Sequence, residues 1–193
     1  MSLDFELIAS ATEYSIAKLN EAGTGELFLL SDFLQPALLT KLTDYIQTAE
    51  LNWSVDPVYR THSRTKVNWE PDTVIEETHT VFSGITDTLN TKFNRQNKFI
   101  GLNIWKDSAG YAIARHRDNR VIDIAIQIYL TSGPKELATT FEYGNSIVQA
   151  DYKANSGYLA DNKAGLYHYL TTPVPWGHTR YSVYGIWSNS SKS

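Results

Sequence analysis

The segment VIDIAIQIYL, residues 121–130, restricts the fold of this chain more than any other stretch. Its even-numbered positions are all aliphatic, whereas its odd-numbered positions include Asp123, Gln127 and Tyr129. Side chains of a strand alternate between the two faces of a sheet, so this period of two predicts a central strand with one apolar and one mixed face. We expect the apolar face to pack on helices. The mixed face either lines a polar pocket inside a jelly roll or faces solvent.

Two helices are expected before this strand. The stretch LQPALLTKLTDYIQTAEL, residues 34–51, carries an apolar stripe at helical spacing and has Pro36 near its start. The stretch TVIEETHTVFSGITDTLNTKF, residues 73–93, has the same spacing. From Phe99 onward, short segments rich in Ile, Val, Tyr, Trp and Phe alternate with Gly, Asn, Asp and Pro. That pattern is typical of an antiparallel sandwich or barrel.

Composition excludes several kinds of chemistry. The chain has 193 residues, which suits a single domain with a sizeable core, and it has no cysteine. Thiolate metal sites, iron–sulfur clusters and cysteine nucleophiles are therefore excluded. The net charge of -4 and the pI near 5.7 argue against a surface that coats nucleic acid. The start of the chain lacks the pattern of a signal peptide, and no run of about 18 apolar residues occurs, so we expect a cytoplasmic protein with no membrane partner.

The stretch YAIARHRDNR, residues 111–120, suggests a metal site. On an extended segment His116 and Asp118 point the same way, about 6 to 7 Å apart at the α-carbon, and can bind one ion. Such a pair also arises by chance in a chain with 5 histidines and 21 acidic residues, so it needs a third ligand. Two histidines and one carboxylate, with open positions left over, form the facial triad of non-haem iron sites.

The third ligand is chosen with the help of the last strand. In RYSVYGIW, Arg180 and Ser182 share one face, and a guanidinium fork with a hydroxyl suits one carboxylate of a small dicarboxylate. His178 would place the metal almost against Arg180, whereas His168 leaves room for a turn between ligand and anchor. A surface ion pair is the alternative role for Arg180. The predicted ligand set is His116, Asp118 and His168.

The order of these residues resembles the iron(II)- and 2-oxoglutarate-dependent dioxygenases, and in particular their prolyl 4-hydroxylase-like branch. SAGYAIARHRDN resembles the approach to the metal in that branch, and IQIYLT and TTFEY resemble two of its later elements. HYLTTPVPWGHTRYSVYGIW resembles its ending, and LFLLSDFLQPALLTKL resembles its opening strand and first helix. The resemblance extends from Leu27 to Trp187.

The resemblance implies a mainly β fold with flanking helices, a double-stranded β-helix (jelly roll) with two N-terminal helices packed on one face. The jelly roll would cover about residues 99–187 and the helical support about residues 27–95 of one domain. Separately, the polar stretch SNSSKS after Trp187 predicts a disordered tail at residues 188–193. The implied cofactors are Fe(II), 2-oxoglutarate as cosubstrate and O2, with L-ascorbate as a reductant of the iron. The implied reaction hydroxylates an unactivated C–H bond, with a peptidyl proline as the leading choice, and converts 2-oxoglutarate to succinate.

For the cosubstrate, the resemblance places the far carboxylate on Arg180 and Ser182, with Asn103 as a further contact. Two features depart from the branch. KELATTF lacks the Gly-Gly-Glu that commonly precedes Thr-x-Phe, so this turn is built differently. Trp105, in NIW, stands where many relatives have a tyrosine that reaches the cosubstrate, and Tyr129 on the mixed face is a candidate to supply the phenol instead.

The substrate is the least constrained part. YRTHSRTKVNW, residues 59–69, places cations at alternate positions, Arg60, His62, Arg64 and Lys66. This segment is either a solvated loop or a lid for an acidic peptide or a phosphate-bearing substrate. We expect a peptide or protein substrate. Two other classes stay open: an AlkB-type nucleic-acid demethylase, whose arginine-rich ending is absent from RYSVYGIWS, and a non-catalytic metal-binding jelly roll.

Overall fold

The computed structural model describes residues 27–48, 53–55, 64–67, 73–119, 121–143 and 145–189. Its centre is a seven-stranded antiparallel sheet in the order β1-β8-β5-β10-β4-β3-β2. The strands are, in that order, β1 (Leu27–Leu30), β8 (Gly157–Asp161), β5 (Ile124–Tyr129), β10 (Arg180–Ser188), β4 (Lys98–Asp107), β3 (Arg64–Val67) and β2 (Trp53–Val55).

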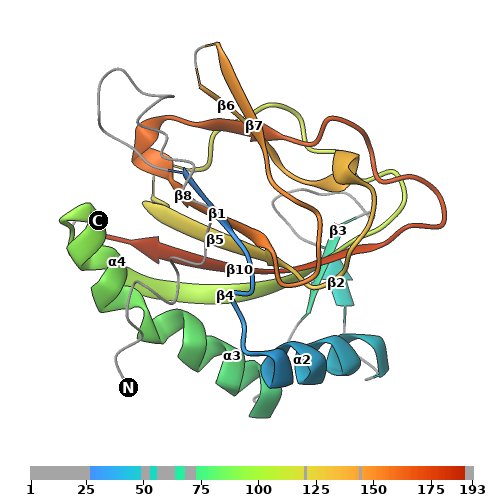
Figure 1. The fold of residues 1–193 in the computed structure, drawn as a ribbon, viewed down its shortest axis with the longest axis horizontal. Helices are drawn as coiled ribbons and strands as arrows, with labels where there is room; N and C mark the ends of the chain where they lie inside the picture. The colour runs from blue at the N-terminus through green and yellow to red at the C-terminus, as the bar shows by residue number, and fades with distance from the viewer. Residues whose placement is uncertain are drawn as a thin grey trace.

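Within the described residues, a smaller antiparallel sheet and three helices cover the two faces of the large sheet. The smaller sheet contains β7 (Ser146–Gln149), β6 (Thr140–Tyr143) and β9 (Tyr167–Tyr169). The helices are α2 (Pro36–Thr48), α3 (Thr73–Gly84) and α4 (Thr86–Phe93), and short 3-10 turns lie at Lys135–Leu137 and Asn162–Ala164. Figure 1 shows the helices on one side of the large sheet and β6 and β7 on the other. The expected mainly β jelly roll with helices on one face is confirmed.

Strand β5 has the two faces that its alternation predicts. Ile124, Ile126 and Ile128 are fully buried in the core that the helices share with the sheet. On the opposite face, Gln127 and Tyr129 are buried as well, with exposed fractions of 5% and 0%. The solvent-facing alternative for the mixed face is therefore wrong, and that face lies inside the molecule.

Helix α2 matches its prediction, whereas the second predicted helix is broken. The pattern at 73–93 suggested one helix, but Ile85 interrupts it with φ -88° and ψ 2°. Gly84 has a low helix propensity, and the Thr86 hydroxyl donates to the carbonyl of Ser83 at 2.7 Å and so competes with regular helical bonding. The same hydroxyl accepts a 3.0 Å bond from Trp187 Nε1, which ties the break to β10. Among the described helices, none is long and apolar enough to cross a membrane.

Close packing of α3 on β10 depends on one glycine. A Cβ at Gly185 would overlap the ring of Phe82, which is fully buried and lies stacked near Trp187 at 6.3 Å between ring centroids. Because Gly185 has no side chain, the aromatic ring can lie directly on the strand. This contact fixes how near the helices come to the sheet.

Both ends of the expected domain division need adjustment. Three strands from the part expected to be helical support, β1, β2 and β3, belong to the large sheet. At the other end, Ser188 is the last residue of β10 and the backbone N–H of Asn189 donates to Asp123 at 2.8 Å, so the expected disordered tail does not begin at residue 188. Residues 190–193 lie outside the described part of the chain, as do Arg60 and His62 of the basic segment.

Candidate active site

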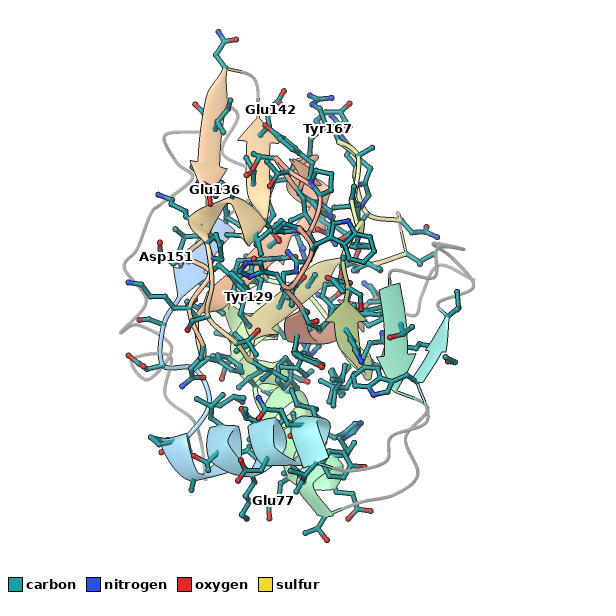
Figure 2. All side chains as sticks on the ribbon, turned by 90° about the vertical axis from the view of Figure 1, so that its right-hand side faces the viewer. Glu77, Tyr129, Glu136, Glu142, Asp151 and Tyr167 are labelled. Atoms are coloured by element: carbon teal, nitrogen blue, oxygen red, sulfur yellow. The ribbon has the colours of Figure 1, made fainter. Side chains whose placement is uncertain are left out.

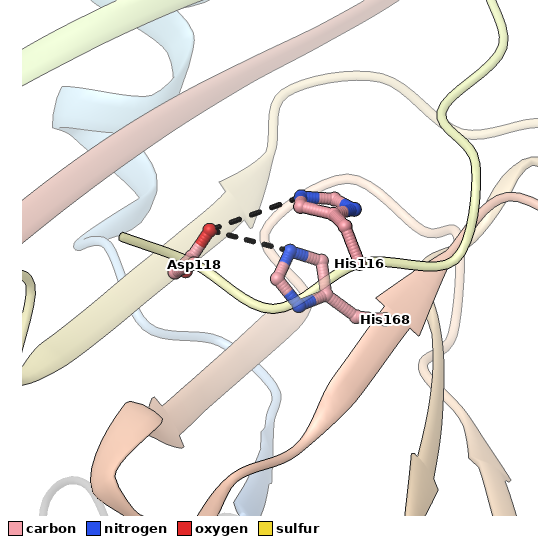
Figure 3. Close-up of side chains that lie close together, drawn as sticks. All are labelled: His116, Asp118 and His168. Atoms are coloured by element: carbon pink, nitrogen blue, oxygen red, sulfur yellow. Dashed lines mark ion pairs between the residues drawn. The ribbon is translucent and has the colours of Figure 1, made fainter. Parts of the chain in front are cut away.

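The three predicted metal ligands come together between the two sheets. His116 and His168, the latter on β9, exchange backbone hydrogen bonds of 3.1 and 2.8 Å in an isolated bridge. Their side chains and that of Asp118 offer nitrogen and oxygen atoms that all lie within 4.8 Å of one another. Asp118 Oδ1 lies 3.4 Å from His168 Nε2 and 4.0 Å from His116 Nε2 (Figure 3). This geometry places three ligand atoms around one point.

His116 is held in the form that binds a metal. Its Nδ1 lies 2.8 Å from the carbonyl oxygen of Ala114, so the proton belongs on Nδ1 and the lone pair on Nε2. Nε2 is buried and makes no hydrogen bond within the described part of the structure. Burial lowers the pKa of His116, and the nearby His168 lowers it further. The ring is therefore neutral near pH 7, as metal binding requires.

Asp118 is oriented by two neighbours that the sequence did not reveal. Its Oδ2 accepts hydrogen bonds from Asn162 Nδ2 at 3.0 Å and from the Tyr184 hydroxyl at 3.1 Å, while Oδ1 faces the histidines. Burial raises the pKa of Asp118, but hydrogen bonds to His168 and Tyr184 and the electrostatic influence of the two neighbouring histidines outweigh it and leave the pKa lowered. Tyr184 could have been found from strand alternation, because it shares a face with Ser182. Nothing in the sequence marked Asn162.

A pocket joins this cluster to the last strand. Asp118, His168 and Arg180 all line it. The other lining residues are Trp105, Tyr111, Ile113, Gln127, Thr139, Tyr158 and Tyr184. The metal-ligand cluster and the predicted carboxylate anchor therefore open into the same space.

Arg180 forms a buried ion pair with Asp107 beside this pocket. The alternative role, a surface ion pair, is therefore wrong. The Arg180 side chain is 2% exposed, and Nε and Nη2 each lie 3.0 Å from Asp107 Oδ2. Nη1 donates to the carbonyl of Leu137 at 2.7 Å. Asp107 and Leu137 thus hold the guanidinium from two directions. Ser182, on the same face of β10 as predicted, is fully buried, and its Oγ makes no hydrogen bond within the described residues.

Tyr129 does not present its phenol to the pocket. Its hydroxyl donates to Thr139 Oγ1 at 3.0 Å and accepts from the backbone N–H of Thr139 at 2.8 Å. Figure 2 shows the residue in the middle of the molecule, where it is fully buried. The phenols at the pocket come instead from Tyr111, Tyr158 and Tyr184.

Asn103 and His178, two other candidates from the sequence, are not among the residues that line the pocket. Asn103 is half-buried on β4, opposite Tyr184, and Trp105 lines the pocket two residues further along the strand. His178 is exposed in the turn before β10 and is not part of the ligand cluster. Lys66 of the basic segment is half-buried on β3, opposite Trp105, so the two side chains share one face of the sheet.

The residues present fit a metal ion and a small anionic ligand. Buried polar side-chain atoms in native proteins nearly always have partners. Here His116 Nε2, Gln127 Nε2 and Ser182 Oγ are buried without one in the described structure. The first offers a lone pair that can bind a metal, and the other two can donate hydrogen bonds to a carboxylate. The donor set therefore suits a metal held beside a carboxylate-bearing molecule.

Comparison with solved structures identifies the fold. The sequence matches no protein-family model and no curated protein. Structurally, the chain is similar to a Pseudomonas putida prolyl-4-hydroxylase, with a TM-score of 0.64, 14% identity, and 91% of this chain and 98% of that chain covered. It is also similar to a Trichoplax adhaerens prolyl hydroxylase in complex with a peptide fragment of the oxygen degradation domain of hypoxia inducible factor (0.63, 14%, 90% and 87%).

A third similar structure is HygX from Streptomyces hygroscopicus with nickel, 2-oxoglutarate and hygromycin B bound. Its TM-score is 0.65 at 8% identity, with 87% of this chain and 84% of that chain covered. At these identities the likeness is one of fold. The jelly roll expected from the sequence is thus the fold of known 2-oxoglutarate oxygenases.

Proposed function

We propose that this protein is an Fe(II)- and 2-oxoglutarate-dependent oxygenase that hydroxylates an unactivated C–H bond. The observation that carries the proposal is the shared pocket of Asp118, His168 and Arg180, beside His116. A metal cluster alone would also fit a non-catalytic binding protein. A cluster that opens toward a buried arginine and an unpartnered serine hydroxyl suits a cosubstrate with a distant carboxylate.

His116, Asp118 and His168 would hold Fe(II) through two imidazoles and one carboxylate. With 2-oxoglutarate and O2 bound, the iron would supply the oxidation, in which R–H, 2-oxoglutarate and O2 give R–OH, succinate and CO2. Asn162 and Tyr184 keep Asp118 Oδ2 occupied, so that Oδ1 stays directed at the metal position.

Arg180 would bind the far carboxylate of 2-oxoglutarate, and Ser182 would donate a hydrogen bond to it. Asp107 and the carbonyl of Leu137 fix the orientation of the guanidinium before the ligand arrives. A preoriented donor loses less conformational freedom on binding. Trp105 and Ile113 line the pocket with apolar surface, which limits the water that competes for these hydrogen bonds.

As substrate we propose a peptidyl proline. Two of the similar structures are prolyl hydroxylases, one of them with a bound peptide, while HygX carries hygromycin B. The net charge of -4 disfavours a nucleic-acid substrate, whose phosphates would be repelled. Lys66, which is paired with the pocket residue Trp105, would favour acidic residues beside the target.

The cofactor part is tested by measuring succinate formed from 2-oxoglutarate in the presence of Fe(II) and ascorbate. We expect His116→Ala and His168→Ala to reduce turnover to background, whereas His178→Ala, an exposed histidine outside the cluster, keeps it. Arg180→Ala should raise the 2-oxoglutarate requirement on the order of 30- to 1000-fold, and Arg180→Lys should recover part of the loss. Wild-type protein that binds metal but forms no succinate would indicate a non-catalytic jelly roll.

The substrate part is tested separately by mass spectrometry on two pools, proline-containing peptides and methylated oligonucleotides. A gain of one oxygen on a peptide proline supports the proposal, and Lys66→Ala should weaken the preference for acidic flanks. Demethylation of oligonucleotides with unmodified peptides would overturn the substrate class and leave the cofactor assignment standing.

A further inference from the structure

Gln127 has a place in the pocket that neither the metal site nor the carboxylate anchor explains. It lies on the inner face of β5 and is 5% exposed, and its side chain lines the same pocket as Asp118 and Arg180. Its Nε2 is buried without a hydrogen-bond partner in the described structure. An unpaired buried donor costs more free energy than an ordinary hydrogen bond returns. A leucine has a similar size and would avoid that cost. The buried amide therefore indicates a ligand that accepts its hydrogen bond.

Tyr158 fixes which way the amide points. The phenol hydroxyl of Tyr158 donates to Gln127 Oε1 at 2.8 Å. Tyr158 is almost completely buried, and burial holds its pKa well above the usual value, so it keeps its proton and remains a donor. A Cβ at Gly157 would overlap the carbonyl of Gln127, so the absence of a side chain there lets β8 approach β5 closely enough for this bond. With Oε1 held, Nε2 is left to face the pocket.

Strand register places Gln127 at the metal end of the pocket. Across the large sheet, Gln127 pairs with Tyr184, the residue whose hydroxyl binds Asp118. Arg180 pairs with Asp107 at the other end, with Ser182 between the two positions. Four residues along β10 separate these ends, a distance of about 13 Å. A diacid anchored at Arg180 would therefore extend past Ser182 toward Gln127.

We infer that Gln127 donates a hydrogen bond from Nε2 to the metal-side carboxylate of the bound 2-oxo acid, and that Tyr158 positions it for this contact. The inference rests on the proposed function and adds to it a residue that selects the cosubstrate. The anchor at Arg180 accepts a carboxylate at one end of the ligand. Gln127 favours a second carboxylate at the other end, so a ligand with both groups binds better than one with either alone.

The test uses the Mn(II)-loaded protein and titrates it with 2-oxoglutarate by calorimetry. Gln127→Met keeps the length of the side chain and removes the donor, and we expect it to weaken 2-oxoglutarate binding on the order of 10- to 100-fold. Mn(II) affinity without 2-oxoglutarate should stay unchanged. Tyr158→Phe should give a smaller loss, because the amide is still present but no longer held. Thr140→Val is the matched control, since Thr140 Oγ1 is also buried and unpartnered but lies outside the pocket lining.

The calorimetric results distinguish a direct contact of Gln127 with 2-oxoglutarate from a structural role. Unchanged 2-oxoglutarate affinity in Gln127→Met overturns the inference and leaves the proposed function intact. A parallel loss of Mn(II) and 2-oxoglutarate affinity also overturns it, because that outcome indicates a structural role for the side chain. Failure of the metal-loaded wild-type protein to bind 2-oxoglutarate would overturn the proposed function itself.

Discussion

On the helix side of the large sheet, Ile126 and Val183 are fully buried among apolar side chains of α2, α3 and α4. On the opposite face the same strands carry Gln127, Ser182 and Arg180, which are buried to the same degree. Polar side chains of the first face, such as Trp187 with its 3.0 Å hydrogen bond to Thr86, have partners within the protein. The second contains a buried ion pair and two polar atoms that the described protein leaves unpaired.

In each of these strands, one face therefore contributes to stability and the other carries the residues proposed to bind ligand. Burial of aliphatic side chains is favourable and needs no partner, so the helix-side face stabilises the fold. Unpaired buried polar atoms on the pocket-side face lower the stability of the folded protein. Apolar burial on the helix-side face offsets this loss. Substitutions on the two faces should therefore have different consequences, even when the residues are neighbours in sequence.

The largest effect is expected at the metal cluster. Asp118→Ala removes the charged ligand and should lower Mn(II) affinity by more than the roughly 10- to 100-fold that outer partners of a metal ligand typically contribute. Titration with Mn(II) measures it. Asp151→Ala, an exposed aspartate away from the pocket, should change nothing. Equal affinities in the two variants would contradict the assignment of the cluster as a metal site.

The next effect concerns stability. Ile126→Ala leaves a cavity on the helix-side face and should lower the free energy of unfolding by about 2 to 5 kcal/mol, while Ile126→Val should cost about 0.5 to 1.5 kcal/mol. Chemical denaturation of the metal-free proteins measures both. The folded Ile126→Ala protein should keep its metal affinity, because Ile126 faces away from the pocket. A weaker metal site in that variant would show that the two faces are coupled.

A smaller effect is expected from the hydroxyl that orients Asp118. Tyr184→Phe removes the 3.1 Å hydrogen bond to Oδ2 and should reduce metal affinity on the order of 10- to 100-fold with little change in stability. Tyr181→Phe is the control on the other face of β10, where the ring packs near Trp53 at 6.0 Å. Metal titrations in which both variants resemble the wild type would remove Tyr184 from the site.

The smallest effect is expected at Ser182. Its hydroxyl is buried without a partner in the described structure, so Ser182→Ala should leave the free energy of unfolding unchanged or raise it by up to about 1 kcal/mol. In the same variant, 2-oxoglutarate affinity should fall by about 2- to 10-fold, the value of one ordinary hydrogen bond. Thermal melting and calorimetry measure the two quantities. A clear loss of stability would mean that the hydroxyl has a structural partner.

Patterns along the chain allowed the fold to be predicted, and they pointed to the residues at the centre of the candidate site. The alternation of 121–130 predicted both faces of β5, and the order of His116, Asp118, His168 and Arg180 predicted residues that the structure brings together. Such patterns can be recognised in a single sequence because strand periodicity and ligand chemistry restrict residue type.

Other features depend on contacts between distant residues and left no local pattern. Trp187 bonds to Thr86 at the helix break, across about a hundred positions of the sequence. Asp107 pairs with Arg180 because β4 and β10 are neighbours in the sheet. The hydroxyl of Tyr129 accepts a hydrogen bond from the backbone N–H of Thr139. The choice of Tyr129 as pocket phenol differed from the structure for that reason. Alternation placed its side chain on the correct face but could not tell which partner its hydroxyl would find.

The proposed function depends on a metal at His116, Asp118 and His168 to which a 2-oxo acid binds as a chelate. Anaerobic addition of one equivalent of Fe(II), followed by 2-oxoglutarate, tests it through the visible charge-transfer absorption of a 2-oxo acid chelated to Fe(II). We predict that the absorption appears in the wild type and in Asp151→Ala, and that it is absent in Asp118→Ala. Wild-type protein that binds both Fe(II) and 2-oxoglutarate without this absorption would contradict chelation at the cluster.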